Sequence, residues 1–204
     1  MTDVLTIQIS VGWPDKFGVF YLRRDKTPDP LRRVFYCLEK TMARISAKDA
    51  GGANVVAFLD MLAYSEIGPV MLKDPQTDDG YRVLVGSLPS KLILMKDYAD
   101  HPNIYNQATN STAAGRYQIL YRYWEHYKAQ LGLRDFGPIS QDRYAIQQFK
   151  EQRALEDIKA GRFEPAIMKC RNIWASLPGA GYGQREHKLD NLAAAYRQAG
   201  GVIV

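Results

Sequence analysis

The sequence has little cysteine and no long apolar run, and each absence excludes a class of protein. Two cysteines in 204 residues cannot form a disulfide framework. Residues 1–30 contain no continuous apolar segment of the kind that a secretory signal peptide requires. No apolar run approaches the roughly 20 residues of a membrane-spanning helix. We therefore expect a protein that is made in the cytoplasm without a signal peptide and does not insert stably into a membrane.

Motifs for metal ions, cofactors and activated nucleophiles are also missing. The three histidines are scattered, and neither HExxH nor a Cys/His cluster occurs. There is no GxSxG elbow and no Cys–His pair at a recognisable spacing. The glycine run GAGYG (179–183) follows a predicted helix rather than a strand, which is the wrong context for a dinucleotide site. It is either a loop that approaches a ligand and presents Tyr182 or a plain connection between helices. We expect no metal and no cofactor.

The charge is positive but is not gathered into blocks. The net charge is +5, and a basic protein favours anionic partners such as nucleic acid, lipid headgroups or bacterial cell wall. Because acidic and basic residues are interspersed, a solvated surface explains most of them, and we expect no nucleic-acid partner.

Residues 1–52 differ in pattern from the rest of the chain. Alternation in VLTIQISV (4–11) predicts a strand, and VFYL (19–22) predicts a second strand that completes a hairpin. Apolar residues recur at helical spacing from Leu31 to Ile45, which predicts an amphipathic helix. A glycine-bearing run then places a boundary near residue 51. We predict an N-terminal extension of unknown role, 1–52, and a main domain, 53–204.

The main domain reads as several helices with a small β element, which is the α+β pattern. A helix capped by Asn54 is predicted to end at Gly68–Pro69, and YRVLVG (81–86) alternates like a short strand. Further helices are predicted at 112–132, at 140–161 with Ser140 as N-cap, at 164–177 and at 187–201.

Glu66 occupies an unusual place in the first of these helices. At 100° per residue it falls within an apolar stripe, whereas Asp60 points away from that stripe. The stripe contains Val55, Phe58, Leu59 and Leu62. A carboxylate there either reaches solvent or an arginine, or it is a general acid whose pKa is raised by loss of hydration. The residues alone leave both interpretations open.

Aromatic residues are plentiful enough to line a carbohydrate groove. The chain has 13 tyrosines and three tryptophans, and sugar faces stack on aromatic rings while hydroxyls require amide and hydroxyl partners. GRYQ (115–118) places Tyr117 beside Gln118. Most other aromatic residues, Trp124 and Trp174 among them, are expected in the core.

Seven blocks of the sequence, taken in order, resemble the lambda-type phage endolysins, which are lysozyme-like lytic transglycosylases. The resemblance runs from about Ala57 to Gly201. The blocks are AFLDMLAYSEIG, DGYRVLVG, DYADHP, STAAGRYQIL, QLGLRDF, ALEDIKAG and NIWASLPGAGYGQREHK. The resemblance implies a lysozyme-like α+β fold with a groove for peptidoglycan. It also implies that Glu66 is the family's single catalytic acid.

The resemblance also implies an activity and a setting. The enzyme would cut the β-1,4 bond between N-acetylmuramic acid and N-acetylglucosamine and leave a 1,6-anhydro end. We expect the groove to involve Tyr81, Ser111, Tyr117, Gln118, Tyr182 and Gln184. The protein would act as a monomer on peptidoglycan in the periplasm, which it would reach from the host cytoplasm through a holin pore.

Two departures and three alternatives accompany this expectation. Arg82 stands where the family has an aspartate, and Ser87 replaces a glycine. A hydrolytic muramidase would need a second carboxylate, for which the candidates are Asp78, Asp79 and Asp100. An inactive wall-binding protein is opposed by the intact Glu66. A membrane-perturbing protein is opposed by the lack of a strongly cationic C-terminal helix face.

Overall fold

The computed structural model describes residues 44–181, 183 and 186–204. The predicted hairpin and nearly all of the predicted helix 31–45 lie outside this part of the chain. Ile45, the last residue of the predicted helix, is described and lies in a bend rather than in a helix. The described residues belong to one compact unit. None of their helices is long and apolar enough to cross a membrane.

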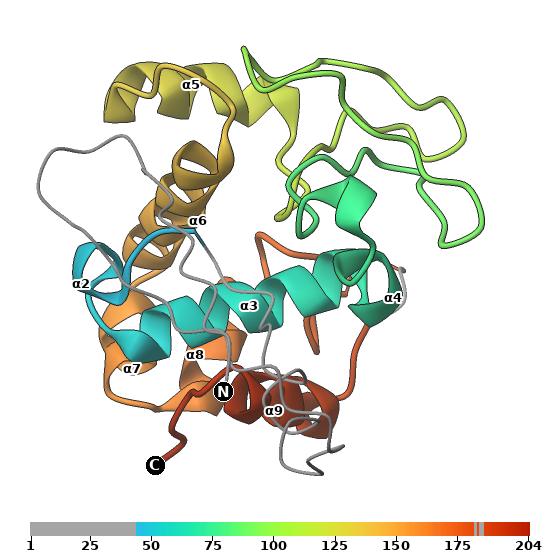
Figure 1. The fold of residues 1–204 in the computed structure, drawn as a ribbon. Coiled ribbons are helices and arrows are strands. Elements are labelled where there is room, and N and C mark those ends of the chain that lie inside the picture. The colour runs from blue at the N-terminus through green and yellow to red at the C-terminus, as the bar shows by residue number, and fades with distance from the viewer. Residues whose placement is uncertain (1–43, 182, 184–185) are drawn as a thin grey trace, which may run out of the picture. The chain divides into compact units, whose positions relative to one another are not determined.

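The helix α3 (Ala53–Ile67) forms the centre of the fold. It crosses the middle of Figure 1 in teal, and α2, α6, α7 and α9 all pack against it. Phe58 on α3 makes edge-on contacts with Phe149, Phe163 and Tyr196 at ring-centroid distances of 5.2, 6.2 and 6.2 Å. Such contacts from several helices bury α3 around its whole circumference.

Two expectations about α3 are wrong, one about the exposure of Asp60 and one about the residue that caps the helix. Asp60, predicted to point away from the core, is 6% exposed, and its charge is compensated by Arg116 at 2.7 Å. Asn54 does not cap the helix, since Gly52 occupies that position. The Asn54 side chain instead donates to the carbonyl of Lys159 and accepts from the amide of Val202. The predicted end of the helix is confirmed, with Gly68 as C-cap and Pro69 beginning α4.

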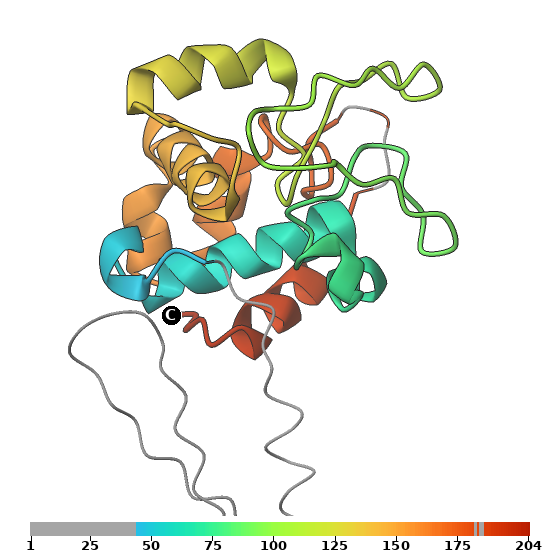
Figure 2. The same cartoon turned by 45° about the horizontal axis from the view of Figure 1, so that its top comes forward.

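Of the other helices, α2, α4, α6, α7 and α9 contact α3, whereas α5 packs on α6 and α8 packs on α7 (Figures 1 and 2). They are α2 (Ala47–Ala50), α4 (Pro69–Leu72), the 3₁₀ turn η1 (Pro75–Thr77), α5 (Tyr121–Leu131), α6 (Pro138–Glu151), α7 (Leu155–Lys159), α8 (Phe163–Cys170) and α9 (Leu189–Gln198).

Three of the predicted helices are shorter or broken. The helix predicted over 164–177 ends at Cys170, because α8 spans only Phe163–Cys170. The helix predicted from residue 112 begins only at Tyr121, because Gly115 and Gln118 adopt positive φ angles of 77° and 47° and close a tight turn. The helix predicted over 140–161 divides into α6 and α7 at Arg153, whose φ is 57°. Gly137, not Ser140, is the N-cap of α6.

The β element is smaller than the alternating pattern of residues 81–86 predicts. Isolated antiparallel bridges replace a continuous strand. They join Val83 to Leu94, Leu84 to Ala114, Leu88 to Lys91, Asn106 to Ser111 and Ala114 to Ile119. These bridged loops, green in Figures 1 and 2, project together beyond the C-terminal end of α3, where Glu66 lies.

Candidate active site

Glu66 lies in the last turn of α3 and is partly buried. Loss of hydration raises the pKa of its carboxyl from 4.5 to about 7. The Ser176 hydroxyl donates a hydrogen bond of 2.5 Å to Glu66 Oε1 and lowers the pKa, but the burial effect is larger. Glu66 therefore exchanges a proton near neutral pH, as a group that must act as both acid and base requires.

Ser176 reaches Glu66 from a segment 110 residues further along the chain. The indole of Trp174 donates to the carbonyl of Tyr117 at 3.1 Å, and the amide of His187 donates to the carbonyl of Ser176 at 2.9 Å. The His187 ring also packs against Tyr64 of α3, with centroids 5.6 Å apart. These contacts hold the segment against the end of α3.

Asp78 and Asp79, candidates for a second carboxylate, are both engaged by arginines. Asp78 forms an ion pair with Arg44 and accepts a 2.5 Å hydrogen bond from the hydroxyl of Tyr98. Asp79 pairs with the fully buried Arg116 at 2.7 Å.

Asp100 is held in a similar way. It pairs with Lys128 and accepts hydrogen bonds from the Trp124 indole and the His101 amide, each at 2.8 Å. These donors outweigh the effect of partial burial and keep the pKa of Asp100 below its usual value. All three carboxylates are thus held by other side chains of the described chain.

Three of the predicted groove residues come together around one cavity. Ser111, Tyr117 and Gln118 line a cavity of about 460 Å³, together with residues of α5, α6 and the segment 172–175. Ala175, which also lines it, directly precedes Ser176 in the chain. Neither Ser176 nor Glu66 is among the residues that line this cavity, so the cavity ends one residue short of the segment's contact with Glu66. Tyr182 and Gln184 lie outside the described residues.

Tyr81 and Tyr117 have no exposed surface. Their hydroxyls donate to the same oxygen of Asp142, Oδ1, at 2.8 and 2.6 Å. Tyr117 borders the cavity, whereas Tyr81 is not among the residues that line it. Neither buried ring has free surface for stacking on a glycan, although we expected both tyrosines to take part in the groove.

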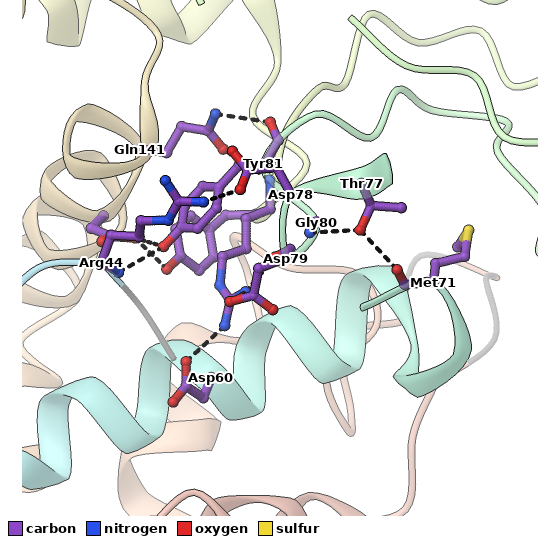
Figure 3. Close-up of polar contacts among 12 residues, drawn as sticks. Arg44, Asp60, Met71, Thr77, Asp78, Asp79, Gly80, Tyr81 and Gln141 are labelled. Carbon is purple, nitrogen blue, oxygen red and sulfur yellow. Dashed lines mark hydrogen bonds and ion pairs between the residues drawn. The ribbon is translucent and has the colours of Figure 1, made fainter. Parts of the chain in front are cut away.

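A buried polar network surrounds these two tyrosines, and Figure 3 draws part of it. Arg116 pairs with Asp60 and Asp79, and its guanidinium lies 5.1 Å from the centre of the Tyr81 ring. The side chain of Gln141 accepts from the amide of Arg116 at 2.9 Å and donates to the carbonyl of Tyr81 at 3.1 Å. The network joins α3, the turn at 78–81 and α6, and it fixes the base of the bridged loops.

Arg82, which departs from the family pattern, has a local role. Its guanidinium donates to the carbonyl of Met95 at 2.9 and 3.3 Å and to the carbonyl of Gln76 at 3.4 Å. These bonds connect two parts of the bridged loops.

The residue that reasoning from the sequence missed is Ser176, together with its neighbour Ser65. Both occur within blocks that carry the resemblance, but no local pattern indicates that Ser176 donates a hydrogen bond to a carboxyl 110 residues earlier in the chain. Among the described residues no group of three histidine, cysteine, aspartate or glutamate side chains is placed to hold a metal ion.

The sequence of this chain matches one family of known proteins. The family model described as Endolysin matches residues 56–203. The endolysin of Escherichia phage P2 is 54% identical over 158 residues, covering 73% of this chain and 94% of the relative. The endolysin of Escherichia phage lambda is 51% identical over 150 residues, covering 72% and 91%.

Solved structures agree with the sequence relatives. The structure described as bacteriophage lambda lysozyme complexed with a chitohexasaccharide superposes with a TM-score of 0.67 at 46% identity, covering 80% of this chain and all of that one. A second lambda lysozyme structure gives a TM-score of 0.65 at 48% identity, covering 75% and 97%. The predicted lysozyme-like fold is thus confirmed, and the chain belongs to the endolysin family, among the lambda-type phage enzymes.

Proposed function

We propose that this endolysin degrades peptidoglycan as a lytic transglycosylase in which Glu66 is the only carboxyl that takes part in the chemistry. The observation that carries the proposal is the environment of Glu66, where burial raises the pKa to about 7 and a serine holds one oxygen. A carboxyl with such a pKa gives up a proton and takes it back at little cost near neutral pH.

The reaction has two proton transfers and one exchange of bonds. Protonated Glu66 gives its proton to the glycosidic oxygen as the bond from that oxygen to C1 of N-acetylmuramic acid breaks, which releases the 4-hydroxyl of N-acetylglucosamine. The muramic 6-hydroxyl oxygen then bonds to C1, and its proton passes to the Glu66 carboxylate. The products are a 1,6-anhydro end, a new N-acetylglucosamine end and an enzyme in its starting state.

The environments of the other candidate carboxylates support this route over hydrolysis. Hydrolysis by the usual routes requires a second carboxyl as nucleophile or as base for a water molecule. Asp78, Asp79 and Asp100 are each held in an ion pair. The 6-hydroxyl requires no such partner, because it is part of the substrate and its proximity alone lowers the barrier by several kcal/mol.

We propose that the glycan strand lies along this cavity and continues past Ala175 to Ser176 and Glu66, which do not line the cavity themselves. Ser111 and Gln118 supply polar groups there, and Tyr117 forms part of its wall. A family member binds a chitohexasaccharide, which supports a glycan ligand for this chain. Tyr182 and Gln184 remain proposed groove residues, while for Tyr81 we propose a structural role.

The proposed setting follows from the family. The enzyme would act as a monomer on peptidoglycan in the periplasm and would depend on a holin to reach it. The boundary near residue 52 and the role of the extension before it remain proposals. The described end of that extension contacts the main domain, because the amides of Arg44 and Ile45 donate to Tyr81 and Asp142.

The pKa of Glu66 predicts how activity depends on pH. The free enzyme requires a protonated Glu66, so the initial rate of wall clearing should fall as the pH rises through about 7. The rate should be measured from pH 5 to 9 at constant ionic strength, with circular dichroism confirming that the fold persists. A rate that stays constant or rises up to pH 8.5 would argue against Glu66 as the acid.

A further inference from the structure

The hydroxyls of Ser65 and Ser176 form a pair beside Glu66. Ser65 directly precedes Glu66 on α3 and is 7% exposed. Its Oγ lies 2.7 Å from Ser176 Oγ, which in turn lies 2.5 Å from Glu66 Oε1. The two serines and the carboxyl form an unbroken row of hydrogen bonds.

Counting hydrogens gives this row a direction. A serine hydroxyl has one hydrogen to donate and two lone pairs with which to accept. Ser176 gives its hydrogen to Glu66 Oε1. The bond between the two serines must therefore be donated by Ser65, so the order of donation is Ser65 to Ser176 to Glu66.

We propose that Ser65 and Ser176 are positioning residues that keep the transferable proton of Glu66 on Oε2. While Ser176 donates to Oε1, Oε1 is an acceptor, and Oε2 is the oxygen left to give and take the proton. Because Ser65 donates to Ser176, the single Ser176 hydrogen is left to point at Oε1, where it stands in the way of a proton on that oxygen. The inference rests on the proposed function, in which one carboxyl serves as acid and then as base.

The surroundings of Ser176 support this role. The backbone carbonyl of Ser176 accepts from His187, and Trp174, two residues earlier, donates to Tyr117. These bonds fix the backbone of the segment, and Ser65 then fixes the direction of the hydroxyl. A carboxyl protonated on Oε1 would turn its proton toward Ser176 and away from the substrate, where it contributes nothing to bond cleavage.

The first test is Ser176→Ala, assayed on soluble uncross-linked peptidoglycan strands. We expect kcat to fall by about 10- to 100-fold with KM within about twofold, since the proton is misplaced while glycan contacts persist. The alkaline limb of the pH profile should move upward, because the lost hydrogen bond is one that lowers the pKa of Glu66. Ser176→Thr retains the hydroxyl, so both kcat and the pH of the alkaline limb should stay close to their wild-type values.

The second test is a double-mutant cycle. If Ser65 acts only through Ser176, Ser65→Ala should lower kcat several-fold in the wild-type background and have no further effect in Ser176→Ala. Ser90→Ala, in an exposed turn, is the matched control and should leave kcat unchanged. Melting temperatures of all variants separate loss of positioning from loss of fold.

The outcomes distinguish this inference from the proposed function. Additive effects of the two serine changes, or an alkaline limb that stays in place in Ser176→Ala, would overturn the inference alone. Activity retained by Glu66→Gln would overturn the proposed function and the inference with it. If an alanine variant fails to fold, Ser176→Thr provides the test. Its pH profile must then match that of the wild type, and a shifted profile would overturn the inference.

Discussion

Glu66→Gln is expected to lose at least about 10²- to 10⁴-fold of wall-clearing activity, the usual contribution of general acid–base catalysis. Glutamine retains the size of the side chain and an oxygen that accepts from Ser176, but it has no proton to give to the glycosidic oxygen. Because one carboxyl serves both proton transfers in our account, no second group compensates for its loss.

The same variant has an expected effect on stability that shows whether its fold is intact. A carboxyl whose pKa is raised in the folded protein destabilises the fold above that pKa. At pH 8 the Gln variant should therefore melt at the wild-type temperature or above it, and at pH 5 the two should be nearly equal. A folded variant that keeps a tenth of wild-type activity would rule out Glu66 as the catalytic acid.

Arg116→Met is expected to give the largest loss of stability, about 3 to 5 kcal/mol in the free energy of unfolding. Arg116 is fully buried and forms ion pairs with Asp60 and Asp79, each at 2.7 Å. Methionine nearly fills the volume but removes the cation, which leaves two carboxylates in a poorly hydrated site.

Urea unfolding of Arg116→Met and of a matched control measures this effect. Arg143→Met, an exposed arginine on α6, should change the free energy of unfolding by no more than about 0.5 kcal/mol. Adding Asp60→Asn to Arg116→Met should recover part of the loss, because one uncompensated charge is removed. A loss below about 1 kcal/mol for Arg116→Met would show that solvent or other groups already compensate these carboxylates.

The elements that could be predicted from the sequence are those specified by local chemistry. Gly68 and Pro69 end α3 where expected, because no residue further away is needed to stop a helix there. Part of the helix predicted over 112–132 is instead a turn at 115–118, which contains Arg116 and Tyr117. Their burial among Asp60 and Asp142 is decided by contacts with distant elements.

The candidate site, too, is predictable only in the part that depends on local sequence and not in the part that depends on distant contacts. Glu66 was selected from an apolar stripe, but α3 is buried around its circumference and Asp60 on the opposite face is buried as well. The stripe therefore draws attention to Glu66 for an incomplete reason, and the family resemblance selects the same residue, which remains our proposed catalytic acid. Ser176 could not be found by spacing, because its partnership with Glu66 depends on the packing of a segment 110 residues away.

Mass spectrometry of the fragments released from purified peptidoglycan tests the central proposal most directly. If the muramic 6-hydroxyl attacks C1 while Glu66 alone moves the proton, the main products are 1,6-anhydromuropeptides and no new reducing ends appear. Each such fragment is lighter by one water molecule than its hydrolysed counterpart. Muropeptides ending mainly in reducing N-acetylmuramic acid would contradict the account and would return attention to Asp78, Asp79 and Asp100 as the source of a second carboxylate.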